Sequence, residues 1–278
     1  MTKLPENKLD IQLIALDLDD TLLNSQAQIS EKNIEVLRRC AALGIYVVLC
    51  SGRAESGILP FVRALNLAGL EAGRYIVAIN GSSVFDLHKR LQIHSQLVSG
   101  EVLLEADDEA EKFGLHSEVY TPDAIFYGKE TEWTLMDCKL CNIQGRQVDD
   151  YKKLLEKGFS KMLVAGEADK IQQLQTKMRA RLGDRAEVFT SKPVFLEIMP
   201  RNVGKGEALL WLADHIGLDP KKTIAFGDGM NDENMILKCG YGVGMKNGQQ
   251  HIKDVASFVT EKTNDEDGVG DFIEKYIL

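Results

Sequence analysis

The sequence predicts an α/β protein whose parallel sheet is interrupted by a separate α+β domain. Two observations carry this prediction. At both ends of the chain, short and wholly apolar runs alternate with segments of helical periodicity, which is typical of a parallel sheet covered on both faces. Between them lies a stretch in which short alternating strands are mixed with acidic helical segments, which is typical of an α+β unit.

The elements follow in order from these patterns. In the first part, residues 1–86, Ser30 is suited to cap a helix and Gly44 to end it. Strands are predicted at 13–16, 45–49 and 75–79, with helices at 30–43 and 54–67. In the inserted part, residues 87–195, helices are predicted at 98–113 and 170–182 and strands at 162–164 and 188–189; extended segments at 84–86, 91–93 and 195–198 adjoin its ends. In the last part, residues 196–278, helices are predicted at 207–216, 231–238 and 267–276 and strands at 223–226 and 242–243.

Composition limits the classes of function. The chain has 278 residues and a formal net charge of −9, which disfavours a nucleic-acid partner. No apolar run approaches the length of a membrane span, and the first residues lack an apolar signal region. The five cysteines are scattered, which suits a reducing compartment. We therefore expect a cytoplasmic protein without membrane or nucleic-acid partners; the oligomeric state is left open.

Polar residues gather where the predicted parallel strands end. Asp17 and Asp19 follow the first strand, and Ser51 follows the second. Another group, Asp228, Asn231 and Asp232, follows the strand at 223–226. The carboxyl ends of parallel strands form one crevice, so these segments should meet there. Residues two apart on an extended chain share a face, so Asp17 and Asp19 can both point into that crevice.

So many carboxylates in one place predict a cation. Oxygen ligands alone suit a hard metal ion, and Mg²⁺ is the default choice. Lys205 opens the helix before the acidic strand and can offset carboxylate and phosphate charge. The hydroxyl of Ser51 and the backbone N–H groups around Gly52, at a helix start, suit an anion.

Three further residues are ambiguous. Arg53 is expected either to touch a substrate or only to bridge surface carboxylates. Asn80 and Gly81 can line the crevice, but as an Asn-Gly pair they equally suit a hairpin turn.

The motifs resemble, in order, the four motifs of the haloacid dehalogenase (HAD) superfamily of phosphohydrolases. They are Asp17-Leu18-Asp19-Asp20-Thr21, Ser51, Lys205 and Gly227-Asp228-Gly229-Met230-Asn231-Asp232. The long insertion between the second and third motifs is similar to the cap of the Cof-type branch, which includes many sugar phosphatases. The resemblance implies a Rossmann-like core with an inserted α+β cap. Asp20 departs from the pattern, since many members carry glycine there, and we expect it to affect the local turn only.

The resemblance also implies roles. Asp17 would be the nucleophile that forms an aspartyl phosphate, and Asp19 the general acid and base. Mg²⁺ would be held by the Asp17 carboxylate, the Asp19 main-chain carbonyl and Asp228, with Asp232 beside them. The phosphoryl oxygens would be bound by Ser51, Gly52, Lys205 and Asn231.

The leading hypothesis is a Mg²⁺-dependent phosphatase acting on a small phosphorylated metabolite, most simply a sugar phosphate. A phosphotransferase or phosphomutase of the same superfamily is the first alternative. A receiver-like phospho-switch is the second, because such a switch also combines an acceptor aspartate, Mg²⁺ and a lysine. An acid/base residue beside the acceptor argues against the switch, since it would shorten the life of the phosphoaspartate.

Overall fold

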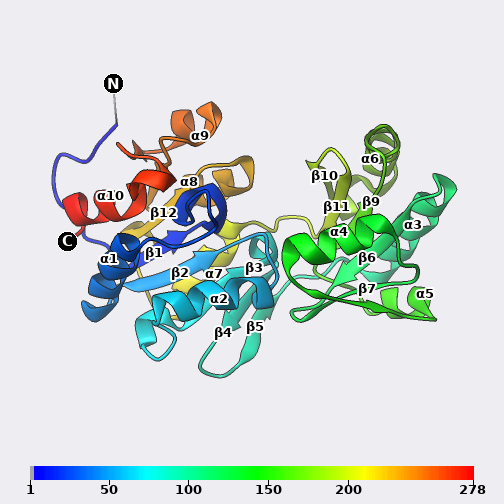
Figure 1. Ribbon diagram of the computed structural model, residues 1–278, viewed down its shortest axis with the longest axis horizontal. Coiled ribbons are helices and arrows are strands. Elements are labelled where there is room, and N and C mark those ends of the chain that lie inside the picture. Colours follow the sequence, from blue (N-terminus) through cyan, green and yellow to red (C-terminus); the bar gives the residue numbers. More distant parts are fainter. Residues whose placement is uncertain (1–2) are drawn as a thin grey trace. The chain divides into compact units, whose positions relative to one another are not determined.

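The computed structural model describes residues 3–278 and divides into two compact units. The first unit comprises the described residues up to Gly52, then Ile58–His94 and Gly204–Leu278. The second comprises Arg53–Gly57 and Ser95–Val203. Each unit contains one β-sheet with its own helices (Figure 1).

The first sheet has eight strands in the order β14-β13-β12-β1-β2-β3-β4-β5. All pairings from β14 to β3 are parallel, and β4 pairs antiparallel with β3. The strands are β1 (Leu13–Leu16), β2 (Tyr46–Cys50), β3 (Tyr75–Ala78), β4 (Ser83–Asp86), β5 (Leu91–Ser95), β12 (Thr223–Gly227), β13 (Tyr241–Gly244) and β14 (Phe258–Val259). The sequence-predicted α/β architecture with a parallel sheet is confirmed.

Helices cover both faces of this sheet, which explains why its central strands are apolar throughout. On one face, Ala208 and Leu212 of α7 and Met235 of α8 pack against Ala15 and Ala225. The other face includes Phe226, whose ring lies edge-on to Phe272 of α10, with centroids 5.5 Å apart. The helices are α1 (Glu31–Ala42), α2 (Glu55–Leu65), α7 (Lys205–His215), α8 (Glu233–Lys238), α9 (Gln250–Val255) and α10 (Gly268–Tyr276).

The second sheet has six strands in the order β10-β11-β9-β6-β7-β8. Its pairings are antiparallel except for β7 with β8, as expected for an α+β unit. The strands are β6 (His116–Tyr120), β7 (Ala124–Tyr127), β8 (Gln144–Gln147), β9 (Met162–Ala165), β10 (Glu187–Lys192) and β11 (Phe195–Met199), and the helices are α3 (Gly100–Lys112), α4 (Glu132–Cys141), α5 (Tyr151–Leu155) and α6 (Ala168–Leu182).

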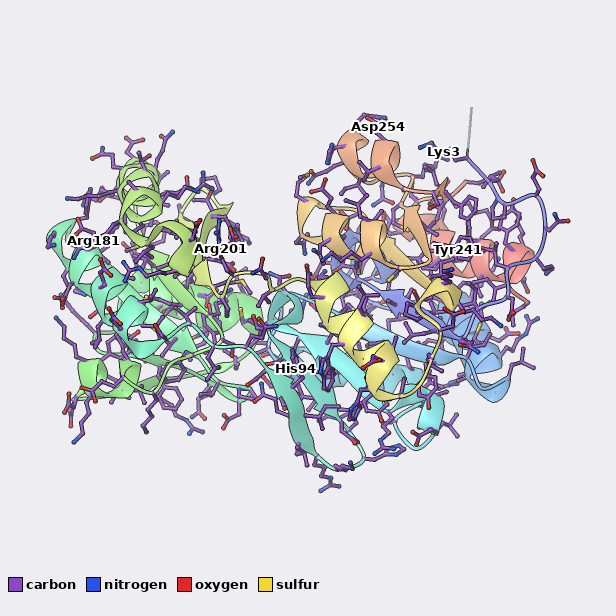
Figure 2. All side chains as sticks on the ribbon, turned by 180° about the vertical axis from the view of Figure 1, so that it is seen from behind. Lys3, His94, Arg181, Arg201, Tyr241 and Asp254 are labelled. Carbon is purple, nitrogen blue, oxygen red and sulfur yellow. The ribbon has the colours of Figure 1, made fainter. Side chains whose placement is uncertain are left out.

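Long helices pack on one face of this second sheet. Val119, Met162 and Val164 of the sheet share a core with residues of α3, α5 and α6. Arg181 of α6, labelled in Figure 2, joins the two long helices. It donates to Glu105 and Glu109 of α3, at 2.5 and 3.0 Å. The α4 helix contributes to a different core, on the opposite face, which contains Tyr120 and Leu163.

The bounds of the two units differ from the division predicted at 86/87 and 195/196. The second unit runs from Ser95 to Val203 because β5 belongs to the first sheet and β11 to the second. The short alternating segments at 91–93 and 195–198 show that strands exist there, but alternation does not say which sheet a strand joins. Within residues 3–278, no helix is both long and apolar enough to span a bilayer.

A group of buried ionisable side chains lies on the α4 side of the second sheet. Glu118 is 2% exposed, and Asp137 of α4, also buried, accepts a hydrogen bond from the hydroxyl of Tyr120. Lys161 is paired with Glu197 at 3.0 Å. Burial, and then the nearby charge of Asp137, raise the pKa of Glu118 from 4.5 to about 9. The folded protein therefore holds a proton on Glu118 at neutral pH.

We predict that Glu118→Gln makes the second unit more stable than the wild type at alkaline pH. The folded wild type retains a proton that the unfolded chain releases above about pH 4.5, so its free energy of unfolding falls as pH rises towards 9. A single proton is worth up to about 1.4 kcal/mol per pH unit in this window. Glutamine carries no such dependence, so the advantage of the variant should grow with pH.

The measurement is urea unfolding from pH 5 to 9, followed by fluorescence. The chain has two tryptophans, of which Trp133 lies in the second unit and Trp211 in the first, so a Trp211→Phe background reports on the second unit alone. Glu156→Gln, at an exposed position of the same unit, is the matched control and should show no pH-dependent gain. An equal difference between Glu118→Gln and the wild type at every pH would contradict the prediction.

Candidate active site

Three neighbouring strands of the first sheet end in polar residues at the same edge. Asp17 follows β1, Ser51 follows β2 and Asp228 follows β12. Because β12, β1 and β2 are adjacent and parallel, their carboxyl ends lie together. The backbone N–H of Asp17 donates to Phe226 O, at 3.1 Å. This hydrogen bond to β12 fixes the main chain of Asp17.

Beyond Asp17 the chain leaves the sheet in an irregular turn, Leu18–Leu22. Asp17 is buried, whereas Asp19 and Asp20 are exposed. Asp20 adopts a left-handed conformation, with φ of 58°, which aspartate tolerates better than most residues and which glycine adopts freely. The backbone therefore supports the expectation that Asp20 shapes the turn. Its carbonyl accepts from Asn247 Nδ2 at 2.8 Å.

Among residues 3–278, Asp17, Asp228 and Asp232 form the one group of three or more His, Cys, Asp or Glu side chains whose ligand atoms all lie within 4.8 Å of one another. Asp232 is fully buried, and its Oδ2 accepts from the backbone N–H groups of Asp228 and Gly229, both at 3.0 Å. Its other oxygen accepts from Lys205, so both oxygens of this carboxylate hold protein groups. Asp232 therefore orders the loop that carries Asp228.

Lys205 is the only positive group bonded to this acidic trio in the described part of the chain. It is 0% exposed, and its Nζ donates to Asp17 Oδ1 at 2.5 Å and to Asp232 Oδ1 at 2.6 Å. Burial by itself would lower its pKa, but the two carboxylates outweigh burial and raise it. Lys205 is therefore charged in the folded protein and holds one carboxylate oxygen of Asp17 in place.

One lysine does not compensate three carboxylates. Burial, then the charge of Asp232, raise the pKa of Asp17 despite Lys205, and the same two causes raise that of Asp228 to about 6. A cation beside Asp17 and Asp228 would remove this penalty. The donor set is all oxygen, which fits a hard divalent ion such as Mg²⁺.

The other residues predicted to contact the phosphoryl group or the substrate are Ser51, Gly52, Asn231 and Arg53. Ser51 is 1% exposed, and both of its backbone groups bond to β3 and the turn after it: its N–H donates to Val77 O, and its C=O accepts from Asn80 N–H, each at 3.0 Å. Gly52 lies in the bend after β2, and Asn231 is exposed in the short 3-10 helix Met230–Asp232. Arg53 belongs to the second unit, so its contact with a substrate stays a prediction.

Two supporting residues were not singled out from the sequence. Thr21 donates from its hydroxyl to Asp228 Oδ1 at 3.0 Å, linking the first and last motifs. The side-chain oxygen of Asn234 accepts from Gly206 N–H at 2.8 Å, which holds the first turn of α7 and hence Lys205. Thr21 stands inside the first motif and Asn234 two residues after the last, but a single threonine or asparagine has no periodicity or spacing that would reveal its partner.

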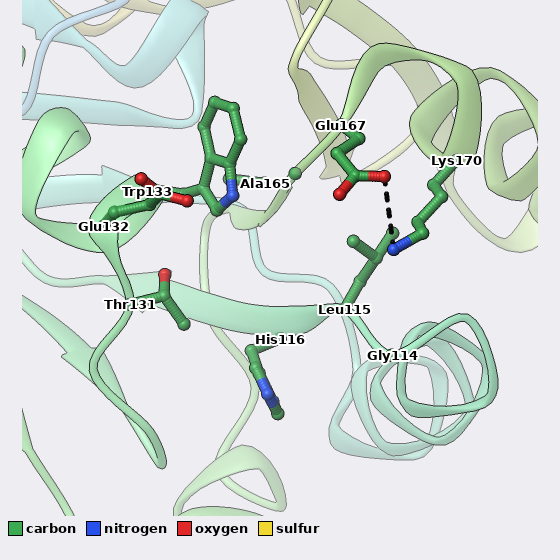
Figure 3. Close-up of a pocket in the computed structure, with 10 residues that line it drawn as sticks. Gly114, Leu115, His116, Thr131, Glu132, Trp133, Ala165, Glu167 and Lys170 are labelled. Atoms are coloured by element: carbon green, nitrogen blue, oxygen red, sulfur yellow. Dashed lines mark ion pairs between the residues drawn. The ribbon is translucent and has the colours of Figure 1, made fainter.

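A separate pocket of about 310 Å³ lies within the second unit (Figure 3). Two of its charged side chains, Glu167 and Lys170, pair with each other at 3.3 Å. None of its residues was predicted as a site residue, and it contains none of the acidic trio. Its lining consists of Gly114, Leu115, His116, Thr131, Glu132, Trp133, Ala165, Gly166, Glu167 and Lys170.

Fold and site together define an α/β enzyme with an aspartate–lysine centre at the carboxyl edge of a parallel sheet. The model of the haloacid dehalogenase-like hydrolase family matches residues 14–273, and the chain belongs to that family. It is accordingly a HAD-type phosphatase, a phosphoric monoester hydrolase. The recognition made from the sequence motifs is confirmed.

Similar proteins are also named as hydrolases or phosphatases. A haloacid dehalogenase-like hydrolase from Bacteroides thetaiotaomicron has a solved structure with 32% identity and a TM-score of 0.87, covering 95% of this chain and 99% of that one. The 5-amino-6-(5-phospho-D-ribitylamino)uracil phosphatase YwtE of Bacillus subtilis is 28% identical over 96% of this chain and 98% of its own. The HMP-PP phosphatase of Escherichia coli is 29% identical over 87% and 86%.

We predict that Lys205→Met lowers the free energy of unfolding of the first unit by about 3–5 kcal/mol at neutral pH, the usual effect of removing one partner of a buried ion pair. The substitution leaves Asp17 and Asp232 buried without their shared cation. Lys222→Met is the matched control, because Lys222 is 38% exposed and pairs with an exposed Asp10. It should leave stability close to that of the wild type.

The measurement is urea unfolding followed by Trp211 fluorescence in a Trp133→Phe background, since Trp211 lies on α7, the helix that begins at Lys205. Equal losses for the two lysine variants would show that the buried triad does not stabilise the fold.

Proposed function

We propose that this phosphatase is Mg²⁺-dependent and releases phosphate from a small phosphorylated metabolite, most simply a sugar phosphate, through an aspartyl phosphate on Asp17. The observation that carries the proposal is the buried contact of Lys205 with Asp17, inside an all-oxygen acidic group. A nucleophile must be held still and must stay ionised, and Lys205 serves both needs by fixing one oxygen and offsetting the charge.

The phosphoryl group would be transferred in two displacements. In the first, a carboxylate oxygen of Asp17 forms a bond to phosphorus while the bond to the leaving oxygen breaks, and Asp19 gives that oxygen a proton. In the second, Asp19 takes a proton from water, which attacks phosphorus and frees Asp17. Asp19 is exposed, which suits a group that must reach both a leaving group and water. Ser51, Gly52, Lys205 and Asn231 would bind the phosphoryl oxygens.

The metal would be held by the Asp17 carboxylate, the Asp19 main-chain carbonyl and Asp228. When bound, it would supply positive charge against the phosphoryl group, which is the main need in phosphoryl transfer. Asp232 would act indirectly, because both of its oxygens already hold protein groups.

The substrate proposal draws on the relatives. One is named for a phosphorylated ribitylamino-uracil and another for HMP-PP, so both names describe small phosphorylated compounds. We also propose that the second unit acts as the cap that selects the substrate, since the acidic trio and Lys205 all belong to the first. A panel of sugar phosphates and phosphorylated pyrimidine precursors, assayed for released phosphate with Mg²⁺ and with chelator, tests the proposed substrate class and metal dependence.

We predict that Asp17→Asn lowers kcat by roughly 10³-fold or more, because an amide is a poor nucleophile and a poor Mg²⁺ ligand. Asp20→Asn is the matched control: asparagine tolerates the left-handed φ of this position, and the Asp20 contact with Asn247 uses the main chain. The control should keep near-native activity in a phosphate-release assay. Near-native turnover by Asp17→Asn would exclude the covalent mechanism.

We predict that the effect of Asp19→Asn depends on the leaving group. A sugar alkoxide needs a proton to leave and a nitrophenolate does not. Formation of the phosphoenzyme from a sugar phosphate should therefore fall by roughly 10²–10⁴-fold, and formation from nitrophenyl phosphate much less. Hydrolysis of the intermediate should slow with both substrates because the base is lost.

Rapid quenching with labelled nitrophenyl phosphate should then trap phosphate on Asp17 of the Asp19→Asn variant. An equal loss of the first step with both substrates, without trapped phosphoenzyme, would mean that Asp19 is not the acid.

A further inference from the structure

The turn after β3 has an unusual backbone. Three consecutive residues, Ile79, Asn80 and Gly81, have φ values of 50°, 49° and 94°. Asparagine and glycine tolerate this region, but a β-branched residue such as isoleucine rarely enters it. Strain of this kind persists only where the surrounding structure holds it in place, and it gathers at functional sites. The contacts of the turn show what it holds.

On one side the turn contacts the segment Ser51–Gly52. Asn80 N–H donates to Ser51 O at 3.0 Å. A Cβ placed on Gly52 would be 3.1 Å from Asn80 Oδ1, so the Asn80 side chain packs directly against Gly52. Within residues 3–278 that buried oxygen has no hydrogen-bond partner, so its contact with Gly52 is one of packing.

On the other side the turn contacts the start of α7. A Cβ on Gly81 would overlap the carbonyl of Gly204 and lie 2.8 Å from Lys205 N. Gly204 is the residue that precedes the helix, and Lys205 is its first residue. Only a residue without a side chain allows this approach, and the left-handed φ of Gly81 requires glycine for the same position.

We propose that the turn Ile79–Gly81 is a positioning element that sets the separation of Ser51 and Lys205. It rests on the proposed function, in which these two residues bind oxygens of one phosphoryl group. Ser51 comes from β2 and Lys205 from α7, and the turn contacts the main chain at both. Asn80 and Gly81 thus act through Ser51 and Lys205.

The test compares two glycine variants. Gly81→Ala should push Gly204 and Lys205 away from the turn. Gly44→Ala, also at a left-handed glycine with φ of 82°, has no atom within 4 Å of the added Cβ, so it reproduces the backbone strain without the displacement. For each we would measure kcat and KM with a phosphomonoester, and the Kd of inorganic phosphate by calorimetry with Mg²⁺.

We expect Gly81→Ala to lower kcat/KM by about 10²-fold, the effect of a misplacement of about 1 Å, and to weaken phosphate binding at least roughly tenfold. Gly44→Ala should match the wild type in both. Equal phosphate affinity and kcat/KM for the two variants would overturn the inference alone. A wild type that neither hydrolyses phosphomonoesters nor binds phosphate would overturn the proposed function, and the inference with it.

If Gly81→Ala does not fold, phosphate binding by the Asn80→Gly variant tests the inference instead. Glycine keeps the left-handed φ and the N–H that binds Ser51, and removes only the carboxamide that packs on Gly52. Weaker phosphate binding at an unchanged unfolding midpoint would support the positioning role, and unchanged binding would overturn it.

Discussion

The buried ammonium group of Lys205 is the constraint on which the first unit depends. A charge that is 0% exposed must be paired, and its two partners, Asp17 and Asp232, come from segments more than 200 residues apart. The pairing is satisfied only when β1, β12 and α7 have all assembled. Because one ammonium group serves both carboxylates, assembly of the fold and formation of the site are the same event.

The paired charges lie at the carboxyl edge of the parallel sheet, where the turns after the strands complete the site. The last residues of the parallel strands lie along one edge of the sheet. The irregular turns that follow the strands then orient individual side chains at that edge. The turn at Leu18–Leu22 exposes Asp19 next to the buried Asp17. The loop after β12 is held by Asp232, which accepts from two of its backbone N–H groups. Regular strands thus set the position of the site, and side chain-to-backbone bonds set its detail.

The parallel sheet and the meeting of Asp17, Lys205, Asp228 and Asp232 were predictable, because apolar runs and strand ends are readable from sequence. The ends of the inserted unit were not: the segments that became β5 and β11 look alike, and sheet membership depends on long-range pairing. Nor was the left-handed Ile79, since its conformation contradicts the preference of a β-branched residue.

The buried carboxylates of the site lower the stability of the folded protein. Burial opposes ionisation of Asp17 and Asp228, and only one lysine opposes three acids. A sequence selected for stability alone would replace such a group by apolar residues of similar volume. Its retention at the edge of a well-packed sheet is the pattern of a functional centre, and in the proposed function a bound cation would relieve the uncompensated negative charge.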